Sequence, residues 1–216
     1  MRNKKKKGYE MELTGRDIEI LRMVYKFRFC LGRHINAIAG FTGLRAADRR
    51  LKILIDAGYL KRKKYLYGVA YLYTLTHKGR VLLGVNKHED KIRIEQIAHD
   101  IYVVESVIYF ISKYGISIHN IESEKELHVK DGFGTRKHHP DFKMNASGKI
   151  YAVEIELNQK TKIKLERNIR DNYLNYDKQI WITNDKKVLA MIESLSDEYS
   201  GIEIIHLKEV ERYARE

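Results

Sequence analysis

One short segment limits the possible folds of this chain more than any other. Residues 150–157 read Ile-Tyr-Ala-Val-Glu-Ile-Glu-Leu, an alternation with a period of two, and successive side chains of a strand point to opposite faces. Glu154 and Glu156 therefore project from one face of a predicted strand whose other face is apolar. The only proline, Pro140, precedes Asp141 and a second strand-like run. The pattern predicts three converging carboxylates, which are suitable ligands for Mg2+ or Mn2+.

An Asp on one strand and an acid-x-acid pair on the next resemble the PD-(D/E)xK nuclease-like fold. In that family the second strand carries an acid-x-Lys pair, whose lysine positions and activates the attacking water. Glu154 matches the first acid, but Glu156 stands in the place of the lysine, so Lys160 or Lys162 would have to supply the ammonium group. If the site is active, the resemblance implies a catalytic set of Asp141, Glu154, Glu156 and Lys160, with Asp141, Glu154 and Glu156 as metal ligands. The alternative is a strand face with two solvated glutamates.

The length and the cysteine content restrict the class of protein. At 216 residues the chain is long enough for one large domain or two small ones. Its single cysteine, Cys30, excludes a disulfide framework and a cysteine zinc site, and we expect it to be a buried thiol. No apolar run reaches the length of a membrane span, and none follows the basic N-terminus as in a signal peptide. We therefore expect a soluble cytoplasmic protein without a membrane partner.

The net charge of +12 is unevenly distributed along the chain. Residues 1–87 contain 21 Lys and Arg against 6 Asp and Glu, whereas residues 88–216 contain 20 against 23. This asymmetry predicts two domains with different partners, the first of which binds a polyanion. Residues 1–11 are interpreted as a flexible basic arm that adds phosphate contacts, with a merely solubilising tail as the alternative.

Residues 12–84 are predicted to form a winged helix-turn-helix domain. Three helices are expected, the first capped by Thr14 and the third capped by Thr42 and ended by Gly58. The third helix has an apolar stripe and an opposite basic stripe, which is what a helix that reads the major groove requires. The basic stripe consists of Arg45, Arg49 and Lys52.

Two strands rich in basic residues and tyrosines, at residues 59–66 and 70–75, are predicted to form the wing. The exit Asp-Ala-Gly-Tyr-Leu from the third helix, and the later run Thr-His-Lys-Gly-Arg, resemble bacterial winged-helix repressors. DNA binding follows as the expectation for this domain. The predicted DNA contacts are Arg45, Arg49, Arg50, Lys52, Lys61, Arg62, Lys63 and Lys64.

Residues 92–216 are predicted to form a restriction-endonuclease-like α/β domain. A long amphipathic helix at residues 93–113 should be followed by the order β-β-β-α-β-α-β. Glu124 and Glu126 are interpreted as an acidic pair on a solvated strand edge, with a further metal ligand as the alternative for one of them. The expected strands lie at residues 117–121, 142–145, 149–157, 179–183 and 202–207, and the expected helices at residues 160–173 and 185–196. The histidines that could join the acidic cluster are His99, His138 and His139.

A winged helix, a helix with the run Ala98-His99-Asp100, an Asp after a proline and an acid-x-acid strand together resemble the replication-relaxation family of mobile genetic elements. The resemblance implies an α/β (α+β) two-domain protein that binds double-stranded DNA sequence-specifically. It would act in the replication or conjugative mobilisation of a plasmid or integrative element, with a degenerate nuclease-like domain and a relaxase or replication initiator as partner. No cofactor is required, although Mg2+ or Mn2+ could bind.

Three further expectations accompany this reading. A homodimer is expected, because a lone winged helix covers little duplex. One alternative function is a metal-dependent DNA endonuclease or nickase. The other is a winged-helix transcriptional repressor whose C-terminal domain dimerises or senses a ligand.

Overall fold

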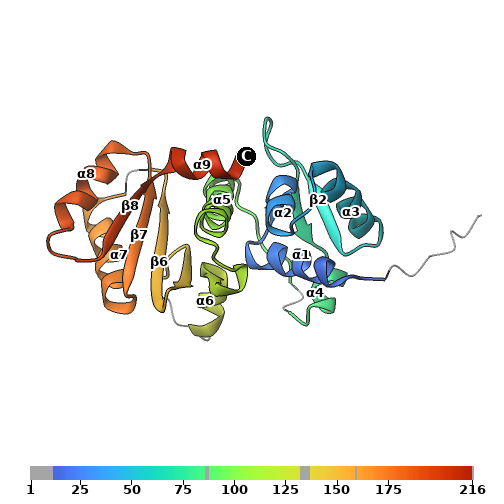
Figure 1. Cartoon of the computed structure of the whole chain (residues 1–216), viewed down its shortest axis with the longest axis horizontal. Coiled ribbons are helices and arrows are strands. Elements are labelled where there is room, and N and C mark those ends of the chain that lie inside the picture. Colours follow the sequence, from blue (N-terminus) through green and yellow to red (C-terminus); the bar gives the residue numbers. More distant parts are fainter. Residues whose placement is uncertain (1–11, 86–87, 132–136, 159, 216) are drawn as a thin grey trace, which may run out of the picture.

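The computed structural model describes residues 12–85, 88–131, 137–158 and 160–215. It is a mixed α/β structure with two separate sheets, and the predicted mixed α/β class is therefore confirmed. Figure 1 shows two bodies side by side, which we call the N-terminal region (residues 12–85) and the C-terminal region (residues 88–215). The predicted basic arm, residues 1–11, lies outside the described part of the chain.

The N-terminal region packs helices on a small antiparallel sheet with the strand order β1-β3-β2. Its first helix begins with a capping box, in which the Thr14 hydroxyl accepts from the Asp17 N–H at 3.3 Å and the Asp17 carboxylate accepts from the Thr14 N–H at 2.7 Å. The predicted Thr14 cap is therefore confirmed. The elements are α1 (Gly15–Lys26), β1 (Cys30–Leu31), α2 (Gly32–Ile38), α3 (Leu44–Asp56), β2 (Leu60–Lys63), β3 (Leu72–Leu75) and α4 (His77–Leu82).

The start of α3 differs from the prediction. Thr42 does not cap this helix, because the first turn is anchored by the carbonyl of Gly43, which accepts from the N–H groups of Ala46 at 3.0 Å and Ala47 at 3.2 Å. The predicted end is confirmed, since Gly58 takes the left-handed conformation with φ of 79°. The β2–β3 strands are also shorter than predicted.

The C-terminal region contains a five-stranded sheet in the order β4-β5-β6-β7-β8. The β4–β5 and β5–β6 pairings are antiparallel, and the β6–β7 and β7–β8 pairings are parallel. In the described part of the chain, no helix is both long and apolar enough to cross a membrane. The strands are β4 (Ile121–Ser123), β5 (Phe142–Ala146), β6 (Lys149–Glu156), β7 (Lys178–Thr183) and β8 (Ile202–His206). The helices are α5 (Ile97–Tyr114), α6 (Glu124–Asp131), α7 (Lys162–Asn175), α8 (Lys186–Leu195) and α9 (Leu207–Arg215), with short 3-10 turns at Ile94–Gln96 and Ile118–Asn120.

Strand β6 has the two faces that its alternation predicted. Val153 and Ile155 belong to the core that also contains α5 and α9, whereas Trp181 of the neighbouring β7 packs with α7 and α8 on the other side. Glu154 lies on the α7 side, where Asn172 donates to it. That face is covered rather than solvated, because Glu154 and Glu156 are only 4% and 5% exposed. The alternative of an exposed acidic strand face is therefore wrong.

Other segments of the C-terminal region depart from the prediction. Residues 117–121 form a 3-10 turn that leads into β4, not a strand over their whole length. Glu124 and Glu126 begin α6 and do not lie on a strand edge, since the Glu126 carboxylate accepts from the Ser123 N–H at 2.9 Å and so closes the first turn. The terminal helix α9 was not predicted, and it packs against α5.

The two regions share one hydrophobic core. Buried side chains of α1, such as Leu21, belong to the same contiguous cluster as buried side chains of α5, such as Val107. Polar contacts surround this core: Arg33 of α2 donates to Glu105 of α5 at 2.5 Å, and Lys125 of α6 donates to the Tyr25 carbonyl of α1 at 2.8 Å. These contacts join the N-terminal region to the C-terminal region through packing as well as charge.

Candidate nucleic-acid interface and acidic cleft

The outer face of α3 presents a stripe of exposed basic side chains. Arg45, Arg49 and Lys52 are exposed, and among the described residues none of them has an ion-pair partner. The opposite face of the helix is anchored by Ala47 and Leu51, each 0% exposed. The predicted division of α3 into an apolar and a basic stripe is thus present, and the basic stripe is available to a partner.

Arg50 differs from its neighbours on α3. Its Nε donates to the Asp17 carboxylate at 2.6 Å, and its Nη2 contacts the other oxygen of the same group. Burial would raise the pKa of Asp17, but the bonds from Arg50 and Thr14 lower it below its usual value. Arg50 therefore ties α3 to the start of α1, although the sequence predicted a DNA contact.

A groove of about 700 Å³ runs between α3 and the β2–β3 hairpin. Arg49 and Lys52 line one wall, and Arg62 and Tyr71 line the other, with the Arg62 guanidinium 4.9 Å from the centre of the Tyr71 ring. The cation on an aromatic face keeps the charge accessible while the ring fixes its position. The groove thus combines exposed cations from both predicted DNA-binding elements. Two acidic residues, Asp48 and Asp56, also line it.

The predicted DNA contacts of the hairpin fall into two groups. Lys63 and Lys64 are exposed and lie over Tyr65 and Tyr67, at 4.9 and 5.6 Å from the ring centres. Lys61 instead forms an ion pair with Glu89 at 2.6 Å. The loop that joins β2 to β3 also packs on the C-terminal region, because Tyr65, Leu66 and Val69 contact a cluster that includes Ile97 of α5.

The second candidate site is a cleft of about 660 Å³ in the C-terminal region, which we call the acidic cleft. It lies where the C-terminal end of β6 meets the N-terminal ends of α5 and α7. All four residues of the predicted catalytic set line it: Asp141, Glu154, Glu156 and Lys160. These four residues therefore line one cleft, and each makes different contacts there.

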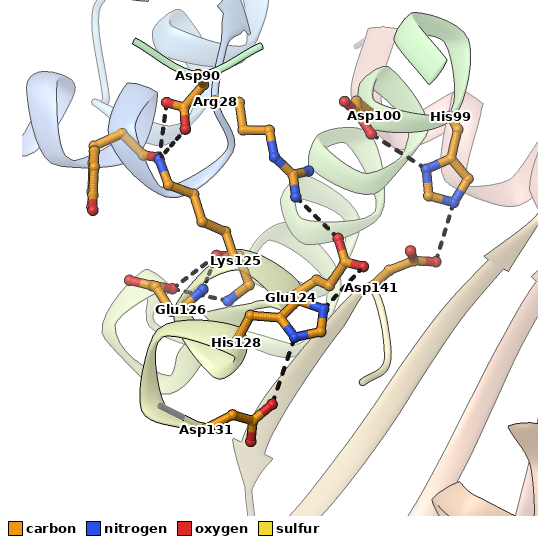
Figure 2. A network of polar contacts seen from close by, with 12 residues as sticks. Arg28, Asp90, His99, Asp100, Glu124, Lys125, Glu126, His128, Asp131 and Asp141 are labelled. Carbon is orange, nitrogen blue, oxygen red and sulfur yellow. Dashed lines mark hydrogen bonds and ion pairs between the residues drawn. The ribbon is translucent and has the colours of Figure 1, made fainter. Parts of the chain in front are cut away.

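Asp141 is held by the backbone and by a histidine. Its Oδ2 accepts from the Ile155 N–H at 2.7 Å and lies 3.3 Å from His99 Nε2. Figure 2 shows His99 of α5 between Asp141 and Asp100, the second of which is 3.4 Å from its Nδ1. Burial alone would lower the pKa of His99, but the two carboxylates raise it to about 11. Burial would raise the pKa of Asp141, but His99 and the Ile155 N–H lower it, so the two groups form an ion pair.

Glu154 contacts a histidine and an asparagine side chain. His138 Nε2 lies 2.8 Å from its Oε1, and the Asn172 amide donates to the same oxygen at 3.1 Å. Burial would lower the pKa of His138, but Glu154 raises it above its usual value. His99 and His138 thus join the acidic cluster as the sequence allowed.

Glu156 and Lys160 form the third pair of the cleft. Glu156 ends β6 and Lys160 follows it four residues later, before α7 begins, and the Lys160 ammonium contacts Glu156 Oε2. Burial raises the pKa of Glu156, and the attraction of Lys160 offsets only part of this effect. Burial would lower the pKa of Lys160, but Glu154 and Glu156 raise it. Lys160 is therefore a charged ammonium that lines the cleft, although it does not stand two residues after Glu154, where the acid-x-Lys pattern has its lysine.

The three carboxylates do not form a ready-made site for a divalent cation. Each carboxylate already contacts a histidine or lysine side chain, so Mg2+ would have to displace the His99, His138 or Lys160 contact. Within the described residues, only one set of three His, Cys, Asp or Glu residues has ligand atoms that all lie within 4.8 Å of one another. That set does not include Asp141, Glu154 or Glu156. Metal binding by Asp141, Glu154 and Glu156 stays a prediction that these contacts do not favour.

The set with close ligand atoms consists of His128, Asp131 and His139. The sequence pattern did not indicate this set, because helix α6, which holds the first two residues at a spacing of three, was not predicted. His139 was a candidate for the acidic cluster, but its Nε2 lies 2.5 Å from Asp131 instead. The His139 contact lowers the pKa of Asp131 below its usual value.

Comparison of the chain with protein-family models, with curated proteins and with solved structures finds no match. The resemblance to the replication-relaxation family is therefore carried only by the short motifs of the sequence.

Proposed function

We propose that the protein binds double-stranded DNA sequence-specifically, with α3 in the major groove. The observation that carries this proposal is the stripe of exposed cations on α3, which have no ion-pair partner among the described residues. Two of them, Arg49 and Lys52, line the groove beside the hairpin. Arginine side chains at the start of a recognition helix can pair with guanine edges, and lysines can contact phosphate. The N-terminal region then serves as a winged helix, with Lys63 and Lys64 of the hairpin near the DNA backbone.

The C-terminal region would be a nuclease-like scaffold that has lost activity. Three antiparallel strands followed by two parallel ones, with acidic residues on β6, support this assignment. Glu156 replaces the lysine of the family, and the charges of the acidic cleft neutralise each other. On this proposal the region supports the DNA-binding surface and contacts other proteins, in agreement with a role in plasmid replication or conjugative mobilisation. A relaxase or replication initiator and a second copy of the chain remain its proposed partners.

The test uses the full chain, because both regions share one core. Binding to duplex DNA should weaken steeply between about 50 and 200 mM salt, since counterions are released on binding. Arg45→Ala combined with Lys52→Ala should reduce affinity for the selected sequence by about tenfold or more. Lys187→Ala, an exposed lysine at the far end of the C-terminal region, is the matched control and should bind normally. Equal affinity of both variants would refute the proposal.

One observation favours the nickase alternative: Lys160 is a charged ammonium inside the acidic cleft. A nuclease would nick supercoiled DNA in the presence of Mn2+ and lose this activity in both Asp141→Asn and Glu154→Gln, which conserve side-chain volume. We expect no nicking by the unmodified protein. Nicking that disappears in both variants would replace the degenerate scaffold with an active one.

A further inference from the structure

A second group of ligating side chains lies at the edge of the acidic cleft. His128 and Asp131 come from consecutive turns of α6, and His139 comes from the segment that leads into β5. Asp131 Oδ2 is 2.5 Å from His139 Nε2 and 3.6 Å from His128 Nδ1. The two imidazole rings are 4.8 Å apart, centre to centre. Two imidazoles thus converge on one carboxylate oxygen.

These distances are close to those of a tetrahedral metal site. Zn2+ holds nitrogen and oxygen ligands at about 2.0–2.2 Å, which places the ligand atoms roughly 3.3–3.6 Å from each other. The His128–Asp131 distance of 3.6 Å already fits. The His139–Asp131 distance of 2.5 Å is that of a hydrogen bond, and it would need to open by about 1 Å through side-chain rotation.

A chain of polar contacts orients His128 from behind. Its other nitrogen, Nε2, is 3.7 Å from Glu124 Oε1, and Glu124 Oε2 is 3.1 Å from the Arg28 guanidinium. Figure 2 shows this chain from Arg28 through Glu124 and His128 to Asp131. The 3.7 Å separation is an ion-pair contact longer than a hydrogen bond, and it places Glu124 where a carboxylate can accept from a metal-bound histidine, an arrangement that accompanies most such histidines. The backbone of Arg28 adopts a left-handed conformation with φ of 67°, which is uncommon for a residue other than glycine.

The surroundings leave room for a fourth ligand. His128 and His139 both line the acidic cleft, whereas Asp131, whose side chain is 9% exposed, contacts both histidines without lining it. Three protein ligands and one open position are the arrangement of zinc sites that bind water or a substrate atom. Two nitrogens and one oxygen suit Zn2+ and related transition metals better than Mg2+, which prefers oxygen ligands.

We propose that His128, Asp131 and His139 bind one Zn2+ or related divalent transition-metal ion, whose fourth coordination position opens into the acidic cleft. Glu124 positions His128, and Arg28 connects this site to the end of α1 in the N-terminal region. The site is distinct from Asp141, Glu154 and Glu156, and it does not depend on the proposed DNA-binding function. It gives α6, which buries only Leu127, a role beyond packing.

The experiment measures Zn2+ binding to the full chain after removal of metal with a chelator, by calorimetry and by the visible absorption of Co2+ as a substitute. We expect one Zn2+ per chain, bound much more tightly than Mg2+. Glu124→Gln should weaken binding by roughly 10–100-fold, and Asp131→Asn and His139→Ala by more than that. His119→Ala removes a histidine that is 69% exposed and lies outside the set, so it should bind as the unmodified protein does.

Three results would overturn the proposal: no Zn2+ binding, binding as tight for Mg2+ as for Zn2+, or equal affinity in Asp131→Asn and the unmodified chain. Circular dichroism of the metal-free variants verifies their folding. If Asp131→Asn does not fold, His128→Gln at a position that is 42% exposed provides the same test, and unchanged affinity there counts against the site.

Discussion

The outer face of α3 and the acidic cleft both concentrate charge, but they differ in whether that charge is already engaged. Arg45, Arg49 and Lys52 point into solvent without ion-pair partners among the described residues. In the cleft, Asp141 and Glu154 are held by His99 and His138. A charge that the fold has not neutralised can attract a partner, whereas a paired one mainly holds its own surroundings together. Charge in the sequence therefore indicates function only after its internal partners are known.

The contrast also exists between adjacent residues. Arg49 is exposed and has no ion-pair partner in the described part of the chain, whereas the next residue, Arg50, is bound to the buried Asp17. Substitutions at paired positions should therefore change stability, and those at free positions should change binding. Four predictions test this rule.

The largest effect is expected at Glu154. Glu154→Ala removes a carboxylate that is 4% exposed and leaves His138 and Asn172 without their acceptor. The free energy of unfolding should fall by about 3 kcal/mol, measured by urea denaturation. Glu154→Gln keeps the volume and one acceptor oxygen, so it should lose less. DNA affinity of the folded protein should not change in either variant, and a large change would show that the cleft takes part in binding.

The two neighbouring arginines should give opposite results. Arg50→Ala leaves Asp17 buried without its cation and should lower the free energy of unfolding by roughly 1–3 kcal/mol. Arg49→Ala should leave stability within about 0.5 kcal/mol and weaken DNA binding by roughly 1–3 kcal/mol. Thermal unfolding and fluorescence anisotropy on the same samples provide the two readings. If Arg50→Ala loses affinity while Arg49→Ala loses stability, the comparison is wrong.

The pair of His99 and Asp141 should make stability depend on pH. The pKa of His99 is raised to about 11 in the folded chain, above its usual value in the unfolded chain, so its contribution is complete below about pH 6.5 and declines as the pH rises. The difference in unfolding free energy between the unmodified protein and His99→Gln should be larger at pH 6 than at pH 9. His119→Gln, at an exposed position, is the control. A difference that grows with pH would contradict the ion pair.

The smallest effect is expected at Lys61, whose side chain is exposed and paired with an equally exposed Glu89. Such surface pairs contribute about 0–1 kcal/mol, so Lys61→Ala should barely change the melting temperature. Its DNA affinity should fall less than that of Lys63→Ala, because Lys61 already forms an ion pair, whereas Lys63 lies over the Tyr65 ring and has no ion-pair partner among the described residues. Equal losses at the two positions would mean that the Glu89 pair opens when DNA binds.

The sequence predicted features that depend on neighbouring residues. The alternation along β6, the Thr14 cap and the Gly58 helix end all follow from local periodicity or backbone conformation. Helix α6 could not be predicted in this way, because Leu127 is its only buried residue and it has no apolar stripe. The sequence pattern therefore predicts a strand edge for the second acidic pair, Glu124 and Glu126.

The partners of the charged residues lie far away in the sequence. The bond between Asp17 and Arg50 spans 33 residues, and the bond between His138 and Glu154 spans 16. Periodicity on α3 placed Arg50 beside the basic stripe and gave no sign that α1 would supply a buried carboxylate. The candidate site residues could thus be predicted as a group. Only the fold shows which of them are already paired with another side chain of the protein.

The continuous core that links α1 to α5 has a consequence for how this chain can change over evolutionary time. A recombination event that replaced residues 12–85 with another DNA-binding module would leave the apolar side of α5 facing a surface that does not fit it. New binding specificity is therefore more accessible through single substitutions on the outer face of α3, which no other part of the described chain covers, than through the exchange of whole regions.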